Sequence, residues 1–173
     1  MFTLVIGGAA SGKSEYAEAL VMKLDGPRVY LAAMEPFGPE AARRIARHRA
    51  MRAARGFETV ERYTDAGGAP LPPGANVLLE DLGNLAANEM YSPAGGGGEA
   101  VFAGVERLLD RCRHLTVVTN EVFSGGVEYE GDTLRYLEVL GSLNCRLAAR
   151  ADRVVEVVCG IPRIRKEHNH VDA

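Results

Sequence analysis

A stretch near the start of the chain has the residue types and the spacing of a loop that binds phosphate. Its sequence, GGAASGKS, fits the pattern G-x-x-x-x-G-K-[ST]. Glycines at these positions let the backbone direct its N–H groups toward phosphate oxygens, and a helix that starts at the end of the loop adds its positive end. Lys13 can then reach the β- and γ-phosphates, and the hydroxyl of Ser14 can bind Mg²⁺. The predicted nucleotide-binding residues of this loop are Gly7, Gly8, Ala9, Ala10, Ser11, Gly12, Lys13 and Ser14.

The alternative interpretation is a glycine-rich turn that contains Lys-Ser by chance. Such a match somewhere in a chain of this size is expected on the order of 1% of the time, from average residue frequencies. A β-rich run precedes the loop and a helical pattern follows it, which lowers that figure further. We therefore predict nucleotide binding, with Lys13 as a catalytic residue.

A bound nucleotide also needs a carboxylate at the end of a neighbouring buried strand to hold its metal ion. The segment NVLLED places Glu80 and Asp81 directly after an apolar run. Both could instead begin a polar turn, and spacing alone does not choose between them. A second polar group, Thr119, Asn120 and Glu121, ends another apolar run. Because open parallel sheets bind ligands at the carboxyl ends of their strands, we expect this group to face the same crevice.

A third candidate feature is the segment 42–56, ARRIARHRAMRAARG, which holds six arginines and one histidine. If the segment is helical, Arg44, His48, Arg52 and Arg55 fall on one face at spacings of four, four and three. Like charges on one face repel each other, so a neighbouring anion would stabilise the arrangement. The alternative is a solvated basic face with an incidental histidine.

The histidine offers chemistry that the arginines do not. A neutral imidazole is a nucleophile near pH 7, and surrounding guanidinium groups favour its neutral form while attracting phosphate. Attack of His48 on an α-phosphate would expel pyrophosphate and leave a phosphoramidate that can pass on a nucleotidyl group. Transfer of a γ-phosphate alone would not need this intermediate.

The elements that must position these residues follow from alternating patterns. Short apolar runs alternate with longer helical patterns, which is typical of a parallel sheet with crossover helices. The expected strands are 2–8, 28–33, 76–81, 115–122 and 153–160, and the expected helices are 12–24, 39–54, 99–113 and 133–151. Segments 64–75 and 92–100 are predicted to be loops. The expected fold class is α/β, with one domain over 1–167 and a polar tail over 168–173.

Composition limits the functions that are open to this chain. Its 173 residues suit a single domain, and a net charge of −3 argues against a general nucleic-acid binder. The three cysteines are odd in number and widely spaced, which does not fit a disulfide framework or a zinc site and favours a reducing cytoplasm. The apolar runs are too short for a signal peptide or a membrane span, so we expect a cytoplasmic protein.

Together these segments resemble the bifunctional adenosylcobinamide kinases and adenosylcobinamide-phosphate guanylyltransferases of cobalamin biosynthesis. The resemblance covers nearly the whole chain, from GGAASGKS through RIARHRAMR, FETVE, LLED and VVTNEV to LGSLNCRLAARADRVVEVVCGIP. The phosphate loop alone is unspecific. Its combination with R-I-x-x-H-x-x-x-R, TNEV and the closing G-I-P is much more specific.

The resemblance implies a P-loop NTPase with a RecA-like, mostly parallel sheet flanked by helices, assembled as a homo-oligomer, a trimer. It also implies two reactions that use Mg²⁺. ATP or GTP phosphorylates adenosylcobinamide, and GTP then guanylylates a histidine, from which GMP passes to the new phosphate to give adenosylcobinamide-GDP and pyrophosphate. A small-molecule kinase that transfers only the γ-phosphate is the alternative. No nucleic-acid partner is expected.

The resemblance also implies roles for single residues. His48 matches the guanylylated histidine, and Arg49 and Arg52 lie in the segment that contacts nucleotide. Glu61 and Glu80 match acids of the nucleotide site, with Ser14 and Glu80 as the expected metal ligands. Arg44, Arg47 and Arg55 are expected to be solvated neighbours of the histidine.

The chain departs from the family pattern after TNEV. Phe123 stands where many members have glycine, and the usual proline and arginine of the next loop are missing. Glu128, Tyr129 and Glu130 make this loop acidic, and Asn144-Cys145 replaces the usual Asn-Gln of the last helix. These departures concern recognition of the acceptor rather than of the nucleotide.

Overall fold

The computed structural model describes residues 1–35, 46–47, 49–123, 125–126 and 128–168. Within this part of the chain, seven strands form one sheet in the order β3-β2-β4-β5-β1-β6-β7. The strands are β1 (Phe2–Gly7), β2 (Arg28–Ala32), β3 (Phe57–Glu61), β4 (Asn76–Glu80), β5 (His114–Asn120), β6 (Arg153–Val158) and β7 (Ile161–Glu167). The helices are α1 (Lys13–Met22), α3 (Leu82–Tyr91), α4 (Gly97–Leu109) and α5 (Gly131–Arg150), with a short 3-10 helix η1 (Ala66–Gly68).

The sheet is mostly parallel, as the alternating pattern predicted. Every neighbouring pair from β3 to β6 is parallel, and only β7 runs antiparallel, against β6. β5 lies between β1, which leads into the phosphate loop, and β4, which ends in Glu80. The sheet edge formed by the carboxyl ends of these strands therefore brings segments from distant parts of the sequence together.

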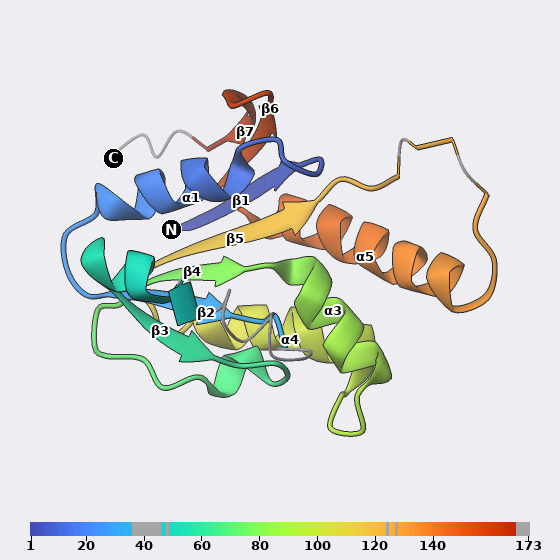
Figure 1. Ribbon diagram of the computed structural model, residues 1–173, viewed down its shortest axis with the longest axis horizontal. Coiled ribbons are helices and arrows are strands. Elements are labelled where there is room, and N and C mark those ends of the chain that lie inside the picture. Colours follow the sequence, from blue (N-terminus) through green and yellow to red (C-terminus); the bar gives the residue numbers. More distant parts are fainter. Residues whose placement is uncertain (36–45, 48, 124, 127, 169–173) are drawn as a thin grey trace.

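Helices cover both faces of the sheet, and the strands are buried on both sides. In β4, Val77 and Leu79 pack into the core under α3, α4 and α5, while Leu78 packs into the core under α1. This alternation has the period of two that a strand requires, with apolar residues on both faces. Figure 1 shows α1 beside β1, and α3 and α4 side by side near β4.

The structure differs from the sequence-based expectation at four elements. β3 and β7 are edge strands that the pattern did not identify, and α3 follows directly on β4. The loop predicted over 92–100 is confirmed for residues 92–96, but its second half is wrong, because α4 already begins at Gly97. The buried Glu89 holds the start of α4 in place. Its carboxylate accepts hydrogen bonds from the backbone N–H of Gly96 (2.7 Å), just before α4, and from that of Asp65 (2.7 Å).

At the chain's end, His168 donates a backbone hydrogen bond to Asp152 (2.9 Å), and the rest of the predicted polar tail lies outside the described residues. Among the described helices, none combines the length and the hydropathy that a membrane span requires.

Candidate nucleotide site

The phosphate loop joins the end of β1 to the start of α1, as the motif requires. A Cβ added to Gly7 would lie 2.6 Å from the carbonyl oxygen of Val157, so only glycine fits there. Gly12 has a φ of +87°, a left-handed conformation that glycine adopts at little cost. The ammonium of Lys13 donates to the carbonyl of Gly8 (3.2 Å) and thus lies over the loop. Its donors therefore lie where a phosphate group would sit.

The turn between β6 and β7 supports the loop from one side. The N–H of Gly160 donates to the carbonyl of Ser11 (2.8 Å), and a Cβ on Gly12 would lie 3.1 Å from the Cα of Gly160. Gly160 has a φ of +76°, so a side chain there would be strained. The closing G-I-P segment, singled out in the sequence only by resemblance, thus has a physical role in holding the phosphate loop.

Ser14 and Glu80 meet at the expected metal position. The hydroxyl of Ser14 donates to the Glu80 carboxylate across the gap between α1 and the end of β4. Asp81 has a different task, because its side chain accepts a hydrogen bond from the backbone N–H of Asn84 (2.6 Å) and caps the N-terminus of α3. Of the two acids, Glu80 is the one that contacts Ser14, and its role as a metal ligand stays a prediction.

Glu80 is mostly buried, and this shapes its electrostatics. Burial raises the pKa of its carboxyl above the usual value, and the charge of Asp81 raises it further. The hydroxyl of Ser14, the phenol of Tyr30 and the guanidinium of Arg52 act in the opposite direction. Its second oxygen, Oε2, is buried and lacks a hydrogen bond of standard geometry to any described residue, although the Tyr30 phenol is close enough to affect the pKa.

These groups fit a Mg²⁺ ion. A hydroxyl and a carboxylate are the hard oxygen ligands that Mg²⁺ prefers, and the buried Oε2 of Glu80 gives the pair unused acceptor capacity. Among the described residues, no group of three or more His, Cys, Asp or Glu side chains could hold a metal ion by itself. Mg²⁺ in nucleotide sites commonly takes its remaining ligands from phosphate oxygens and water.

The arginine-rich segment is helical at residues 46–47 and 49–54, as predicted for this part of it. Arg43, Arg44 and His48 lie outside the described residues. Arg55 forms an ion pair with Glu18 of α1, so it is not merely a solvated neighbour. Arg52 also reaches Glu18, with 4.0 Å between its Nε and the carboxylate, and its side chain is only 16% exposed. This helix therefore packs beside α1.

Arg49 points toward a different acid. Its guanidinium lies 3.8 Å from the carboxylate of Glu61, at the end of β3. Glu61 and Glu80 both align with Ala32, from opposite sides of β2, so their Cα atoms are about 10 Å apart. The two predicted acids thus share one sheet edge, and one of them pairs with a predicted nucleotide-contacting arginine.

Tyr30, on β2, is a site residue that the sequence reasoning missed. Its ring is buried, with the Cζ of Arg52 3.5 Å from its centroid and the ring of Phe57 edge-on at 6.2 Å. Burial, and next the charge of Glu80, raise the pKa of its phenol, which therefore stays protonated and able to donate. A tyrosine within the apolar run RVYLAA was the available signal, because a buried phenol needs a partner.

The three polar residues at the end of β5, Thr119, Asn120 and Glu121, do not all face the same part of the molecule. The hydroxyl of Thr119 is buried and donates to the side chain of Asn144 on α5 (2.7 Å), so the expectation that it faces the crevice is wrong. Asn144 in turn donates to the carbonyl of Asn120 (3.3 Å). Asn120 pairs with Gly7 across the sheet, and the N–H of Glu121 donates to the Gly7 carbonyl (3.0 Å). Thr119 therefore anchors α5, while the next two residues border the phosphate loop.

Comparison with known proteins agrees with this geometry. Residues 3–164 match the family described as cobinamide kinase / cobinamide phosphate guanyltransferase. The chain belongs to this family.

Relatives within the cobinamide kinase / cobinamide phosphate guanyltransferase family match over almost their full length. The bifunctional adenosylcobalamin biosynthesis protein CobU of Salmonella typhimurium is 36% identical, over 93% of this chain and 97% of the relative. The protein of the same name from Escherichia coli is 33% identical over the same shares. CobP of Pseudomonas aeruginosa, also described as bifunctional, is 32% identical over 94% of this chain and 95% of its own.

Solved structures outside this family confirm the expected P-loop fold with a RecA-like sheet. The flagellar accessory protein FlaH of Methanocaldococcus jannaschii aligns with a TM-score of 0.52 at 9% identity, over 96% of this chain and 78% of its own. An ATPase of a bacterial type III secretion system aligns with a TM-score of 0.53 at 11% identity, over 95% of this chain and 56% of its own. At such identities the likeness concerns the fold alone.

Proposed function

We propose that this chain phosphorylates adenosylcobinamide with ATP or GTP and then transfers GMP from GTP, through a guanylyl-histidine at His48, to give adenosylcobinamide-GDP and pyrophosphate. Family membership supports both reactions. The structural observation that carries the proposal is the hydrogen bond between Ser14 and Glu80 beside the phosphate loop. It forms the metal end of a nucleotide site, next to a helix rich in arginine.

In the first reaction the phosphate loop holds the nucleoside triphosphate. Backbone N–H groups of residues 8–14 bind the β- and γ-phosphates, and the ammonium of Lys13 leaves the Gly8 carbonyl for a phosphate oxygen. Mg²⁺ held by Ser14 and Glu80 would neutralise charge on the same oxygens. The acceptor hydroxyl attacks the γ-phosphorus, the bond to the β,γ-bridging oxygen breaks, the nucleoside diphosphate leaves, and the hydroxyl proton passes to solvent.

In the second reaction the attack moves to the α-phosphorus of GTP. A ring nitrogen of His48 forms the P–N bond, and pyrophosphate leaves with the electrons of the broken P–O bond. A phosphate oxygen of phosphorylated adenosylcobinamide then attacks the same phosphorus and releases the imidazole. Arg49 and Arg52, which follow His48 closely in the sequence, stabilise the charge that develops on the phosphoryl oxygens.

The proposal extends to the setting of the enzyme. We propose a homo-oligomer, a trimer as the family resemblance implies, in the cytoplasm. The free thiols of Cys112, Cys145 and Cys159 agree with a reducing compartment.

The decisive experiment uses Mg²⁺ and GTP labelled at the α-phosphate. Label that is stable to alkali, labile to acid and retained on the denatured protein is expected for the wild type and for the control His168→Ala, and is expected to be absent in His48→Ala. Wild-type protein without label, or His48→Ala with unchanged label, contradicts the guanylyl-histidine. If such a protein still phosphorylates adenosylcobinamide, its function is that of a γ-phosphate kinase.

A further inference from the structure

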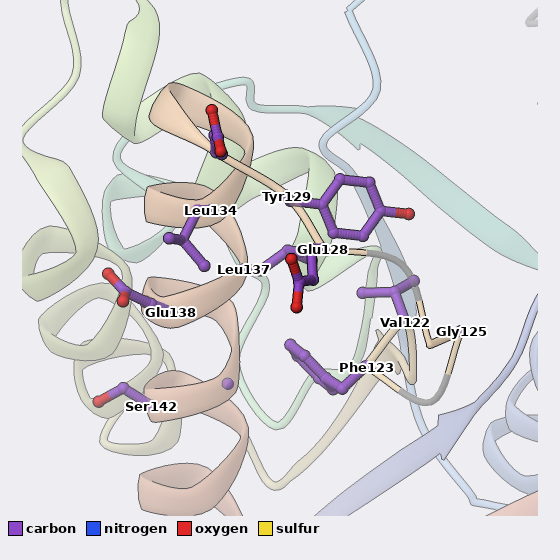
Figure 2. A pocket seen from close by; sticks show the side chains of 11 residues that line it. Val122, Phe123, Gly125, Glu128, Tyr129, Leu134, Leu137, Glu138 and Ser142 are labelled. Carbon is purple, nitrogen blue, oxygen red and sulfur yellow. The ribbon is translucent and has the colours of Figure 1, made fainter.

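A cavity of about 660 Å³ lies outside the nucleotide site, between the segment that follows β5 and the first half of α5 (Figure 2). One wall comes from described residues of the segment after β5, and the other from one face of the first half of α5. The described residues that line it are Val122, Phe123, Gly125, Glu128, Tyr129, Glu130, Leu134, Leu137, Glu138, Gly141 and Ser142.

The walls of this cavity carry large apolar side chains that are exposed to solvent. Phe123 is 44% exposed, Tyr129 43% and Leu134 42%. Figure 2 shows that Phe123 and Leu137 face the space between the two walls, and that the Tyr129 ring lies on the loop side, near Val122. Gly141 lies next to the ring of Phe123, since a Cβ there would be in van der Waals contact with it at 3.5 Å. The cavity therefore presents apolar surface to a ligand with a broad, weakly polar face.

The charge of the lining has one sign. It includes Glu128, Glu130 and Glu138, and none of its described residues is basic. A nucleoside triphosphate would be repelled by three carboxylates, so this cavity is not a second nucleotide site. A ligand with positive charge and with N–H groups that donate to carboxylates would be favoured instead.

The cavity also borders the phosphate loop along the sheet. Asn120 pairs with Gly7, and the wall begins at Val122, two residues after Asn120. Figure 1 shows this segment and α5 on the side toward which β1, β4 and β5 point. A ligand bound here therefore lies at the same edge of the sheet as the triphosphate, the edge formed by the carboxyl ends of the strands. An acceptor of the γ-phosphate must lie at this edge.

We propose that this cavity binds the corrin part of the acceptor, adenosylcobinamide, before it is phosphorylated. The identity of the acceptor rests on the proposed function, whereas the place of the site rests on the cavity. An alkylcobalt(III) corrin has a net positive charge, apolar edges and peripheral amides whose N–H groups can donate to carboxylates. Phe123, Tyr129 and Leu137 contact the apolar surface of the ring, and Glu128, Glu130 and Glu138 attract its charge and accept from its amides.

This assignment gives the departure from the family pattern a purpose. The family resemblance leads one to expect a glycine at position 123 and an arginine in the next loop, where this chain has Phe123 and the acids Glu128 and Glu130. In our proposal this chain binds the acceptor through an aromatic ring and carboxylates, in place of the arginine that the family resemblance leads one to expect. The corrin site should accordingly be particular to this chain and its near relatives.

The test measures adenosylcobinamide binding to the full-length protein by equilibrium dialysis, using the absorbance of the corrin. Phe123→Ala and Tyr129→Ala are each expected to weaken binding about tenfold, the order expected when an aromatic contact is lost. Glu128→Lys is expected to weaken it more, and increasingly so at low salt. Labelling by α-labelled GTP should stay unchanged in all three. The matched controls are Ile164→Ala, an exposed apolar residue on β7, and Glu58→Lys, an exposed acid on β3.

The outcomes separate the site from the function. If the wild type performs both reactions but the three variants bind adenosylcobinamide like the controls, the site is wrong and the function stands. If the wild type binds adenosylcobinamide but transfers no phosphate, and the variants lose binding, the function is wrong and the site stands. Variants that change the oligomer mass but not the affinity assign this face to a second copy of the chain and overturn the proposal.

Discussion

The guanidinium of Arg52 lies over the ring of Tyr30, with its Cζ 3.5 Å from the ring centroid. The phenol of the same tyrosine lowers the pKa of the Glu80 carboxyl, and this carboxylate accepts a hydrogen bond from Ser14. A continuous set of contacts therefore joins the arginine-rich helix to the phosphate loop. Movement of that helix must change the surroundings of the carboxylate that we expect to hold Mg²⁺.

Tyr30→Phe tests this connection with little change in packing. The ring under Arg52 remains, but Glu80 loses the phenol that lowers its pKa, so the ionised carboxylate becomes less favourable. We expect the Mg²⁺ concentration for half-maximal kinase activity to rise about threefold to tenfold, the size of one hydrogen bond to a charged group. Tyr30→Leu, which also removes the stacking, should have a larger effect. Identical Mg²⁺ curves for Tyr30→Phe and wild type would show that the phenol is not part of the site.

Glu80→Gln and Asp81 variants separate two adjacent acids. Glu80→Gln removes the charge beside Ser14 and is expected to reduce both reactions by at least about a hundredfold, because the metal loses its protein carboxylate. Asp81→Ala removes the cap of α3 and is expected to lower the free energy of unfolding by about 1 kcal/mol while retaining most activity. Asp81→Asn should restore the stability. The assignment fails if Asp81→Asn is inactive and Glu80→Gln is active.

The pH dependence of stability follows from the raised pKa of Glu80. Its folded pKa lies above the usual value of 4.5, so folding favours the protonated carboxyl. The resulting stabilisation is complete below the unfolded pKa and is lost as the pH rises through the folded pKa. Without nucleotide and Mg²⁺, Glu80→Gln should therefore gain free energy of unfolding relative to wild type as the pH rises from about 4.5. Urea unfolding of both proteins between pH 4 and about 7 measures this, and a constant difference would contradict it.

Gly12→Ala tests the fit of the phosphate loop against the turn after β6. Alanine at a φ of +87° is strained, and its Cβ would lie 3.1 Å from the Cα of Gly160. We expect a loss of stability of about 1–2 kcal/mol and a large loss of GTP affinity. Gly74→Ala is the matched control, since it has a φ of +70° but open space around the added Cβ. Equal loss of GTP affinity in both variants would mean that backbone strain alone, rather than contact at the loop, is responsible.

The sequence by itself determined the features that depend on neighbouring residues. The phosphate loop was predicted in full because its eight positions are contiguous and because its function depends on backbone freedom and one lysine. The alternation of apolar runs and helical patterns likewise predicted the α/β class and the parallel sheet. The edge strands β3 and β7 were not predicted, because short strands with exposed residues lack a clear apolar pattern.

Only the tertiary structure decided which distant side chains meet. Glu80 and Asp81 are adjacent in sequence, yet one reaches Ser14 and the other caps α3, because each leaves the end of β4 in a different direction. Tyr30 and Gly160 became site residues through the strand order, which places β2 beside β4 and the β6–β7 turn against the phosphate loop. Strand order depends on packing across the whole sheet, and no local pattern of residues encodes it.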